Sequence, residues 1–303
     1  MGTERCPKGL EMSPGDYSVR VNDVDLSYSV AGDGPILFVT SPGWGIGARY
    51  LQKGLKPLLQ NLKIVFVTAR GSGKSGRPTD MSRMGSAHMA DDIDGLRHHL
   101  GLETIDLFGH SNGGAIAVAY AQRHAAHLRK LILTSSQLIG FDVSATINSF
   151  LERAANDPRY SEAARYVGRA FPEDNDEFRA HFIRRLPLYF HDPNNYVSTF
   201  IRDMGASFSA CAYHAQAAAD RLPEANQVGK LATITAETLV IVGRHCWICP
   251  PSVSERLHSG IDGSKLVVLE NTGHFPWIEE PELFFPEINR FLARPSGPDY
   301  VGG

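Results

Sequence analysis

The chain has 303 residues, of which 43% are hydrophobic and 21% charged, and its formal net charge is −3 at pH 7. This composition supports one large folded domain, or one domain with a sizeable insertion, and excludes a disordered or collagen-like chain. Because no basic block is present, the sequence predicts neither a nucleic-acid nor a membrane partner.

The sequence also predicts where the protein acts. The first thirty residues lack the continuous apolar run of a signal peptide, and apolar runs elsewhere fall short of the roughly 20 residues that span a bilayer. Four cysteines are too few for a disulfide framework in a chain of this length. We therefore expect a reducing, cytoplasmic setting.

Strand-like and helix-like segments alternate in the first part of the chain. Two alternating runs, 17–21 and 24–30, predict an antiparallel hairpin at the edge of a sheet. Helical spacing of apolar residues covers 86–100, and a second helix follows Asn112. Further β-rich runs lie at 36–40, 63–67, 104–108 and 131–134. This alternation predicts an α/β protein with a mainly parallel sheet and helices on both faces.

The strand pattern disappears from about 137 to 235, where proline-punctuated helical stretches follow one another. It returns at 238–242 and 265–269, with helical patterns after each run. We therefore predict a first core segment over residues 1–136, a helical cap insertion over 137–235 and a second core segment over 236–303. The tail from residue 294 is rich in glycine and proline, and we expect it to fray.

The strongest catalytic motif is Gly109-His110-Ser111-Asn112-Gly113, between an apolar strand pattern and an Ala-rich helix pattern. This is the G-x-S-x-G signature of a nucleophile elbow, a sharp turn that projects the serine above the sheet. Larger side chains two residues before and after the serine would collide, so glycine is required at both places. The motif alone also fits a glycine-rich turn with a solvated serine, but its flanking elements favour the elbow.

Further motifs follow in order along nearly the whole chain: Ser41-Pro42-Gly43-Trp44-Gly45, Ala69-Arg70-Gly71-Ser72-Gly73-Lys74-Ser75, Arg185-Leu186-Pro187-Leu188-Tyr189-Phe190 and Asn271-Thr272-Gly273-His274-Phe275. With the elbow, they resemble the α/β-hydrolase superfamily, and especially proline iminopeptidase-like hydrolases of peptidase family S33 and their fungal relatives. The resemblance implies a mostly parallel eight-stranded sheet with an inserted helical cap. It also implies a cofactor-independent serine hydrolase with a catalytic triad.

The resemblance assigns roles to individual residues. Ser111 would be the nucleophile and His274 the general base. The oxyanion hole would use the backbone N–H groups of Asn112 and Trp44, or of Gly43 or Gly45 if the loop register differs. A plain glycine turn at 41–45 is the alternative. His110 and the remaining histidines are expected to be packing or surface groups.

The acid position departs from the family pattern. Relatives read Gly-Arg-x-Asp after the seventh strand, whereas this chain reads Gly243-Arg244-His245-Cys246. A carboxylate fixes the tautomer of the base, so Cys246 predicts weakened or lost turnover, although a thiolate could supply part of this function. Cys246 could equally be a substitution that silences the enzyme. Glu270 and Asp142 are less well placed as replacements.

Two other motifs point to different chemistry. Cys246-x-x-Cys249 also fits a redox or metal site, but no second cysteine pair completes four zinc ligands. The Gly71–Ser75 segment resembles a phosphate-binding loop, but Thr68 stands where that loop requires glycine. We therefore expect neither a metal nor a nucleotide cofactor.

The cap would carry substrate specificity. Aromatic residues there, including Phe171, Tyr189 and Phe190, indicate an apolar pocket wall, although a plain cap core explains them equally well. A family aminopeptidase would hold a free amine with cap carboxylates, and the candidates are Glu152, Glu162, Glu173, Asp174, Asp176 and Glu177.

Three functions stay open. The first is hydrolysis of an ester, lactone or amide of a small, partly apolar molecule through a Ser111 acyl-enzyme. The second is a non-hydrolytic cyclase, lyase or isomerase of a natural-product pathway, with His274 as base. The third is a pseudoenzyme that binds a ligand without turnover.

Overall fold

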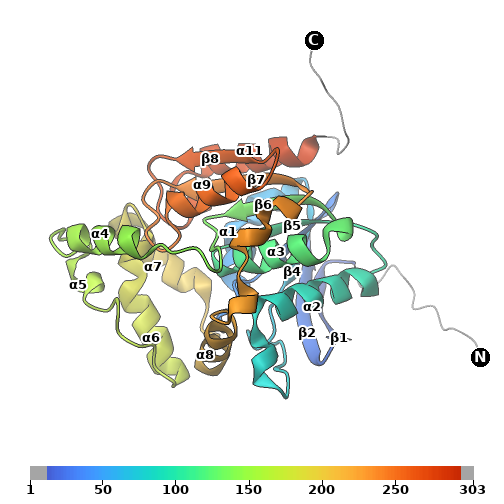
Figure 1. Cartoon of the computed structure of the whole chain (residues 1–303), viewed down its shortest axis with the longest axis horizontal. Helices are drawn as coiled ribbons and strands as arrows, with labels where there is room; N and C mark the ends of the chain where they lie inside the picture. Colours follow the sequence, from blue (N-terminus) through green and yellow to red (C-terminus); the bar gives the residue numbers. More distant parts are fainter. Residues whose placement is uncertain (1–11, 295–303) are drawn as a thin grey trace, which may run out of the picture.

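Eight short strands form one sheet in the computed structural model, which describes residues 12–294 (Figure 1). The strands are β1 (Gly15–Val21), β2 (Val24–Ala31), β3 (Ile36–Thr40), β4 (Lys63–Val67), β5 (Ile105–His110), β6 (Leu128–Thr134), β7 (Glu237–Gly243) and β8 (Lys265–Leu269). Their order across the sheet is β1-β2-β4-β3-β5-β6-β7-β8. The β1–β2 hairpin is antiparallel and β2 pairs antiparallel with β4, whereas all later pairs are parallel. The predicted fold class and edge hairpin are confirmed.

Helices cover both faces of this sheet, so the central strands are apolar on both sides. In β3, Phe38 packs in the same core cluster as α2 (Ser86–His99), α3 (Asn112–Arg123) and α9 (Pro251–Gly260). Its neighbours Leu37 and Val39 pack in the opposite cluster with α1 (Arg49–Gly54) and α11 (Pro281–Ala293). This alternation follows from the two-residue repeat of a strand. A short helix, α10 (Pro276–Glu279), precedes α11.

Five α-helices and three short 3-10 helices connect β6 to β7. No strand lies between Thr134 and Glu237, a stretch that is fully described. These cap helices are α4 (Ser144–Ala154), α5 (Ser161–Ala164), α6 (Asn175–Arg185), α7 (Pro193–Met204) and α8 (Ala210–Ala219). Figure 1 shows α4 to α7 gathered on one side of the sheet. The helical content agrees with the expected insertion, while its boundaries remain a prediction.

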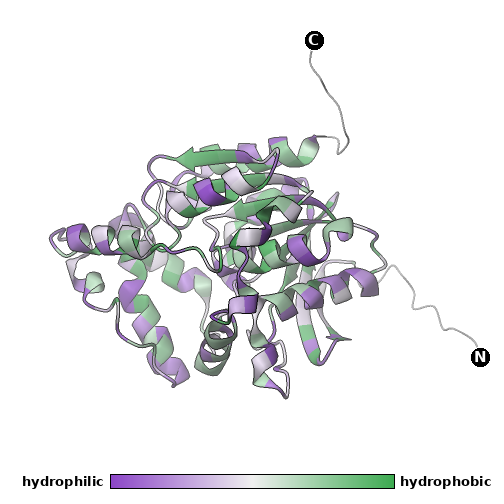
Figure 2. Ribbon diagram, viewed as in Figure 1, coloured by the Kyte–Doolittle hydropathy of each residue, from purple (hydrophilic) through white to green (hydrophobic). Residues whose placement is uncertain are grey.

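Hydrophobic residues are concentrated in the strands, and polar residues mark the outer surfaces of the helices (Figure 2). Within residues 12–294, no helix is long and apolar enough to cross a membrane. The tail expected to fray lies outside the described residues apart from Arg294.

Candidate active site

Ser111 lies at the turn between β5 and α3 with φ 58° and ψ −126°. A positive φ is strained for a residue with a side chain and is maintained only where its surroundings hold it. Here the Ser111 N–H donates to the Thr134 carbonyl at 3.1 Å, and the Ser111 carbonyl accepts from the Gln137 N–H at 2.9 Å. The turn between β5, β6 and α3 therefore holds Ser111 in a conformation it would not adopt alone.

The two glycines of the motif differ in how much space they have. A Cβ on Gly109 would lie 2.4 Å from the Gly113 carbonyl oxygen and 2.8 Å from the Ala117 Cβ. A Cβ on Gly113 would lie 3.1 Å from the Thr40 carbonyl oxygen. The collision expected from the sequence is therefore severe at position 109 and milder at position 113.

His274 follows β8 and is 2% exposed. Its N–H donates to the Tyr189 carbonyl at 2.7 Å, which ties the loop to the cap. Its Nδ1 lies 3.1 Å from Cys246 Sγ, so the cysteine occupies the place of the acid beside the imidazole. Burial lowers the pKa of His274 well below its usual value, and the ring is therefore neutral at neutral pH.

Cys246 is also buried, and burial raises the pKa of its thiol to about 12. A neutral thiol can either donate to His274 Nδ1 or accept from it, whereas a carboxylate can only accept. If the thiol donates, the ring proton resides on Nε2, which then cannot accept a proton from a nucleophile. Cys246 therefore does not fix the tautomer as an aspartate would.

Cys249 lies beside Ser111. Burial raises the pKa of its thiol, and a hydrogen bond from Ser111 opposes this shift. The two cysteines of the C-x-x-C motif thus lie beside His274 and Ser111, respectively. The motif alone does not predict this placement, because the positions of the two thiols depend on how the turn after β7 folds toward β5.

The carboxylates weighed as alternative acids do not approach the imidazole. Glu270 is exposed and pairs with Arg244 at 2.8 Å. Asp142 is exposed and accepts from the Ser144 N–H at 2.9 Å.

Two other carboxylates hold the loop that carries His274, and the sequence analysis missed both. Glu279 Oε2 accepts from the Gly273 N–H at 2.7 Å, and Glu280 Oε2 accepts from Thr272 Oγ1 at 2.6 Å. They stabilise the loop backbone rather than the ring. No catalytic motif contains them, because their role depends on how α10 folds back onto the loop.

His110 links the elbow to the base. Its Nε2 lies 2.9 Å from the His274 carbonyl oxygen, which only accepts, so Nε2 carries the proton. Nδ1 consequently accepts from the Tyr50 hydroxyl at 2.9 Å. Burial lowers the pKa of His110 to about 3, so it stays neutral. The expected packing residue also positions the backbone of His274.

The turn proposed for the oxyanion hole has three consecutive residues with left-handed backbone: φ is 65° at Gly43, 51° at Trp44 and 67° at Gly45. The Trp44 N–H donates to Gln216 Oε1 at 2.6 Å. Gln216 is fully buried on α8, and its Nε2 donates to Asn112 Oδ1 at 2.6 Å. A carbonyl oxygen from the cap thus accepts from one of the proposed donors. Sequence reasoning missed Gln216, which lies in an Ala-rich stretch without a motif.

Ser111 and His274 line one apolar cavity of about 40 Å³, enough for little more than a water molecule. Of the three aromatic residues expected to form a pocket wall, Tyr189 lines this cavity and the other two do not. Phe171 packs on Tyr213 with ring centroids 4.6 Å apart, and Phe190 packs on Phe275 with centroids 5.0 Å apart. The other side chains that line the cavity include Pro42, Tyr50, Phe182, Phe200, Met204 and Phe275. A substrate would have to displace these side chains or move the cap.

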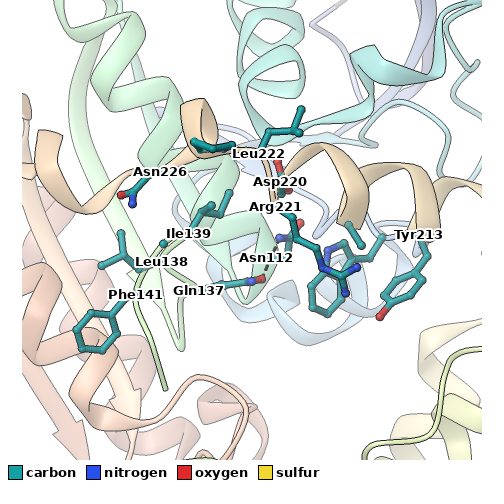
Figure 3. A pocket seen from close by; sticks show the side chains of 14 residues that line it. Asn112, Gln137, Leu138, Ile139, Phe141, Tyr213, Asp220, Arg221, Leu222 and Asn226 are labelled. Carbon is teal, nitrogen blue, oxygen red and sulfur yellow. Dashed lines mark hydrogen bonds between the residues drawn. The ribbon is translucent and has the colours of Figure 1, made fainter. Parts of the chain in front are cut away.

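A second pocket of about 430 Å³ adjoins the first, since Trp44 lines both. Figure 3 shows Asn112 hydrogen-bonded to Gln137, with Tyr213 and Arg221 at the same pocket. Its lining mixes polar and apolar side chains, in contrast to the apolar cavity at Ser111.

One cluster could be taken for a metal site. The ligand atoms of Asp94, His124 and His127 lie within 4.8 Å of one another, beyond the end of α3 opposite Ser111. Arg97 Nε already donates to Asp94 Oδ1 at 2.7 Å, and its positive charge opposes a bound cation. We therefore assign no metal to this cluster.

A family model described as the alpha/beta hydrolase fold matches residues 37–281. The chain belongs to the α/β-hydrolase fold family. Among relatives of this α/β-hydrolase, proline iminopeptidase PfmaB of Pestalotiopsis fici is 29% identical over 290 residues, covering 91% of this chain and 99% of the relative. Pimeloyl-[acyl-carrier protein] methyl ester esterase of Neisseria meningitidis is 27% identical over 272 residues, covering 86% and 79%. The resemblance to proline iminopeptidase-like enzymes is confirmed.

Solved structures show the same fold at lower identity. An esterase from Exiguobacterium antarcticum matches this α/β-hydrolase with a TM-score of 0.69 and 22% identity, covering 89% of this chain and 96% of the other. The enol-lactonase from Burkholderia xenovorans LB400 matches with a TM-score of 0.66 and 20% identity, covering 92% and 100%. Since one fold serves many substrates, the substrate must be argued from the site.

Proposed function

We propose that this α/β-hydrolase is a serine hydrolase that cleaves an ester, lactone or amide of a small, partly apolar molecule through a Ser111 acyl-enzyme. One observation carries the proposal: the strained Ser111 and the buried His274 line the same apolar cavity. The hydrolase relatives support it. The expected cytoplasmic setting belongs to the proposal and is compatible with Cys211, Cys246 and Cys249 being free thiols.

In the first half of the reaction, Ser111 Oγ attacks the carbonyl carbon while His274 Nε2 takes the hydroxyl proton. The carbonyl π electrons move to oxygen, and the N–H groups of Asn112 and Trp44 stabilise the resulting oxyanion. The tetrahedral intermediate then expels the leaving group, which takes the proton from His274. Water repeats the sequence on the acyl-enzyme, releases the acid and restores Ser111.

Two conditions follow from the geometry. His274 must adopt the tautomer in which Nδ1–H donates to Cys246 Sγ, because only then does Nε2 accept a proton. Gln216 must also release the Trp44 N–H before that group can bind an oxyanion. Both conditions predict slow turnover with an ordinary substrate.

A second function is favoured by the Gln216 contact. With the Trp44 N–H held by Gln216, His274 could act only as a base while Ser111 hydrogen-bonds the substrate. A cyclase, lyase or isomerase reaction of this kind needs no acyl-enzyme.

Intact-mass analysis after treatment with a fluorophosphonate tests the proposal without a known substrate. We expect one covalent adduct on the parent protein and none on Ser111→Ala. Ser254→Ala, which removes another buried hydroxyl from α9, is the control and should label like the parent. An adduct that persists in Ser111→Ala, or no adduct on the parent after hours, would reject the acyl-enzyme and favour base-only chemistry or ligand binding.

A further inference from the structure

Arg185, at the end of α6, is a buried cation that has no acidic partner within residues 12–294. It is 7% exposed, and its Nε has no hydrogen-bond partner. His181 precedes it by one helical turn, is 6% exposed and has an unpartnered Nε2. Burying a charge without a counter-charge is unfavourable, so a fold that retains one commonly binds an anion there.

Aromatic rings surround the guanidinium. Arg185 Cζ lies 4.8 Å from the Phe171 ring centroid and 5.7 Å from that of Trp247. The His181 ring packs on the same Phe171 at 4.8 Å. Ring faces stabilise a cation but cannot accept its in-plane N–H groups as a carboxylate does. The arrangement therefore holds the guanidinium in place and leaves hydrogen-bonding capacity for a ligand.

Two aromatic side chains, Trp247 and Tyr189, connect this cluster to the cavity at Ser111. Phe182 lines that cavity and lies three residues before Arg185, a spacing that places both on one side of α6. On the other side of the guanidinium, the Trp247 ring packs on Tyr189 at 5.7 Å, and Tyr189 packs on His274 at 5.3 Å. Tyr189, one of the side chains between Arg185 and His274, also lines the cavity and must shift to admit a substrate.

Among the residues that the structure describes, no acidic side chain lines the cavity at Ser111. The six carboxylates that could hold a free amine are all exposed, and none lines the cavity at Ser111: Glu152, Glu162, Glu173, Asp174, Asp176 and Glu177. The further cations Arg169 and Arg184 lie on the Tyr166 ring, 4.9 and 5.4 Å from its centroid. The local charge thus opposes an amine and favours an acid.

We propose that Arg185, assisted by His181, binds a carboxylate of the substrate, so that the enzyme acts on an ester, lactone or amide that also carries a free acid group. This proposal rests on the proposed hydrolase function and names its substrate class. The planar guanidinium matches a carboxylate with two parallel N–H···O bonds, which a lysine would not reproduce. His181 supplies a third nitrogen from the preceding turn.

Binding of 4-phenylbutyrate and of its neutral amide, 4-phenylbutyramide, to Ser111→Ala tests the proposal by calorimetric titration. The two probes have nearly the same shape, but the amide is neutral and has an NH2 donor in place of one carboxylate oxygen. Both carry a ring suited to the apolar walls. We expect the carboxylate to bind roughly tenfold or more tightly than the amide, as charge-assisted hydrogen bonds would give. Arg185→Gln in the same background should reduce this preference to about twofold or less.

Arg184→Gln is the matched control, because it removes the neighbouring, exposed arginine of the same helix. It should retain the preference, and Arg185→Lys should retain part of it. Equal affinity for the two probes in Ser111→Ala, or a preference that survives Arg185→Gln, would overturn the proposal. Since the titration needs no turnover, an acid preference in a protein that fluorophosphonate does not label would reject hydrolysis while leaving the carboxylate site intact.

Discussion

Gln216 joins the cap to both proposed donors of the oxyanion hole. Its Oε1 accepts from the Trp44 N–H, and its Nε2 donates to the side chain of Asn112, the residue after Ser111. An oxyanion formed at Ser111 would therefore compete with a neutral amide oxygen for the Trp44 N–H. Since one such donor is worth on the order of 10²–10³ in rate, this competition bears directly on activity.

Gln216→Leu should accelerate fluorophosphonate labelling of Ser111 by about tenfold or more, because it removes the competing acceptor at similar volume. It should also lower the free energy of unfolding by about 1–3 kcal/mol, since the Asn112 side chain loses a buried partner. Labelling rates and urea unfolding measure the two effects. Gln227→Leu is the control, because Gln227 is also buried and its Nε2 donates to the Ala115 carbonyl at 2.7 Å. This substitution should lower the free energy of unfolding without accelerating the labelling of Ser111. Unchanged or slower labelling of Gln216→Leu would contradict the competition.

At the scale of elements, the β5–α3 turn makes the two glycines of the elbow unequal. Gly109→Ala would push a methyl group into the Gly113 backbone, which cannot move without distorting α3, whereas Gly113→Ala needs only a small shift near Thr40. We expect losses of roughly 3 kcal/mol or more and about 1 kcal/mol, respectively, in the free energy of unfolding. Urea titration at neutral pH compares them. Equal losses would show that the turn relaxes more than its geometry indicates.

The same elements show what the sequence could predict. The predicted strands at 36–40, 63–67 and 265–269 match β3, β4 and β8. Each is a short apolar run between turn-forming or polar residues, so its ends can be placed from the sequence. β5 continues to His110, two residues beyond the predicted run, since the turn at Ser111 extends the pairing with β6. Ser111, His274 and Cys246 were predicted because each follows a strand at a family position.

Other site residues were not predictable, for a physical reason. Gln216, Glu279 and Arg185 act through contacts across the interface between cap and core, which local periodicity does not encode. The protonation states of Cys246 and His274 likewise depend on burial. Sequence motifs therefore predict which residues the proposed reaction would use, but not the environment of those residues.

For the whole molecule, two buried neutral histidines couple stability to pH. The pKa of His110 is about 3 in the folded protein and about 6.5 in an unfolded chain, so the unfolded state binds a proton first as pH falls. Stability is therefore complete above about pH 6.5 and declines below it, by about 2 kcal/mol at pH 5 for His110 alone. His274 acts in the same direction.

Urea midpoints at pH 7 and pH 5 measure this coupling. His110→Gln can keep hydrogen bonds to Tyr50 and to the His274 carbonyl but cannot titrate, so it should lose less stability between the two pH values than the parent. All other titrating groups are shared, so the difference isolates position 110. An equal loss in both proteins would show that His110 does not stay neutral in the fold.

In the proposed reaction, a neutral thiol at position 246 limits the activity of the Ser111–His274 pair. The most direct test is the rate of fluorophosphonate labelling of the parent, Cys246→Asp and Cys246→Asn. A carboxylate would hold the active tautomer of His274, so Cys246→Asp should label about 10²-fold faster than the parent. The acceleration should not exceed about 10⁴-fold, the rate lost when a triad aspartate is replaced by its neutral isostere. Cys246→Asn introduces the shape of aspartate without its charge, and its labelling should be no faster than that of the parent. If Cys246→Asp labels no faster than the parent, or Cys246→Asn labels as fast as Cys246→Asp, the neutral thiol does not limit the activity of Ser111 and His274.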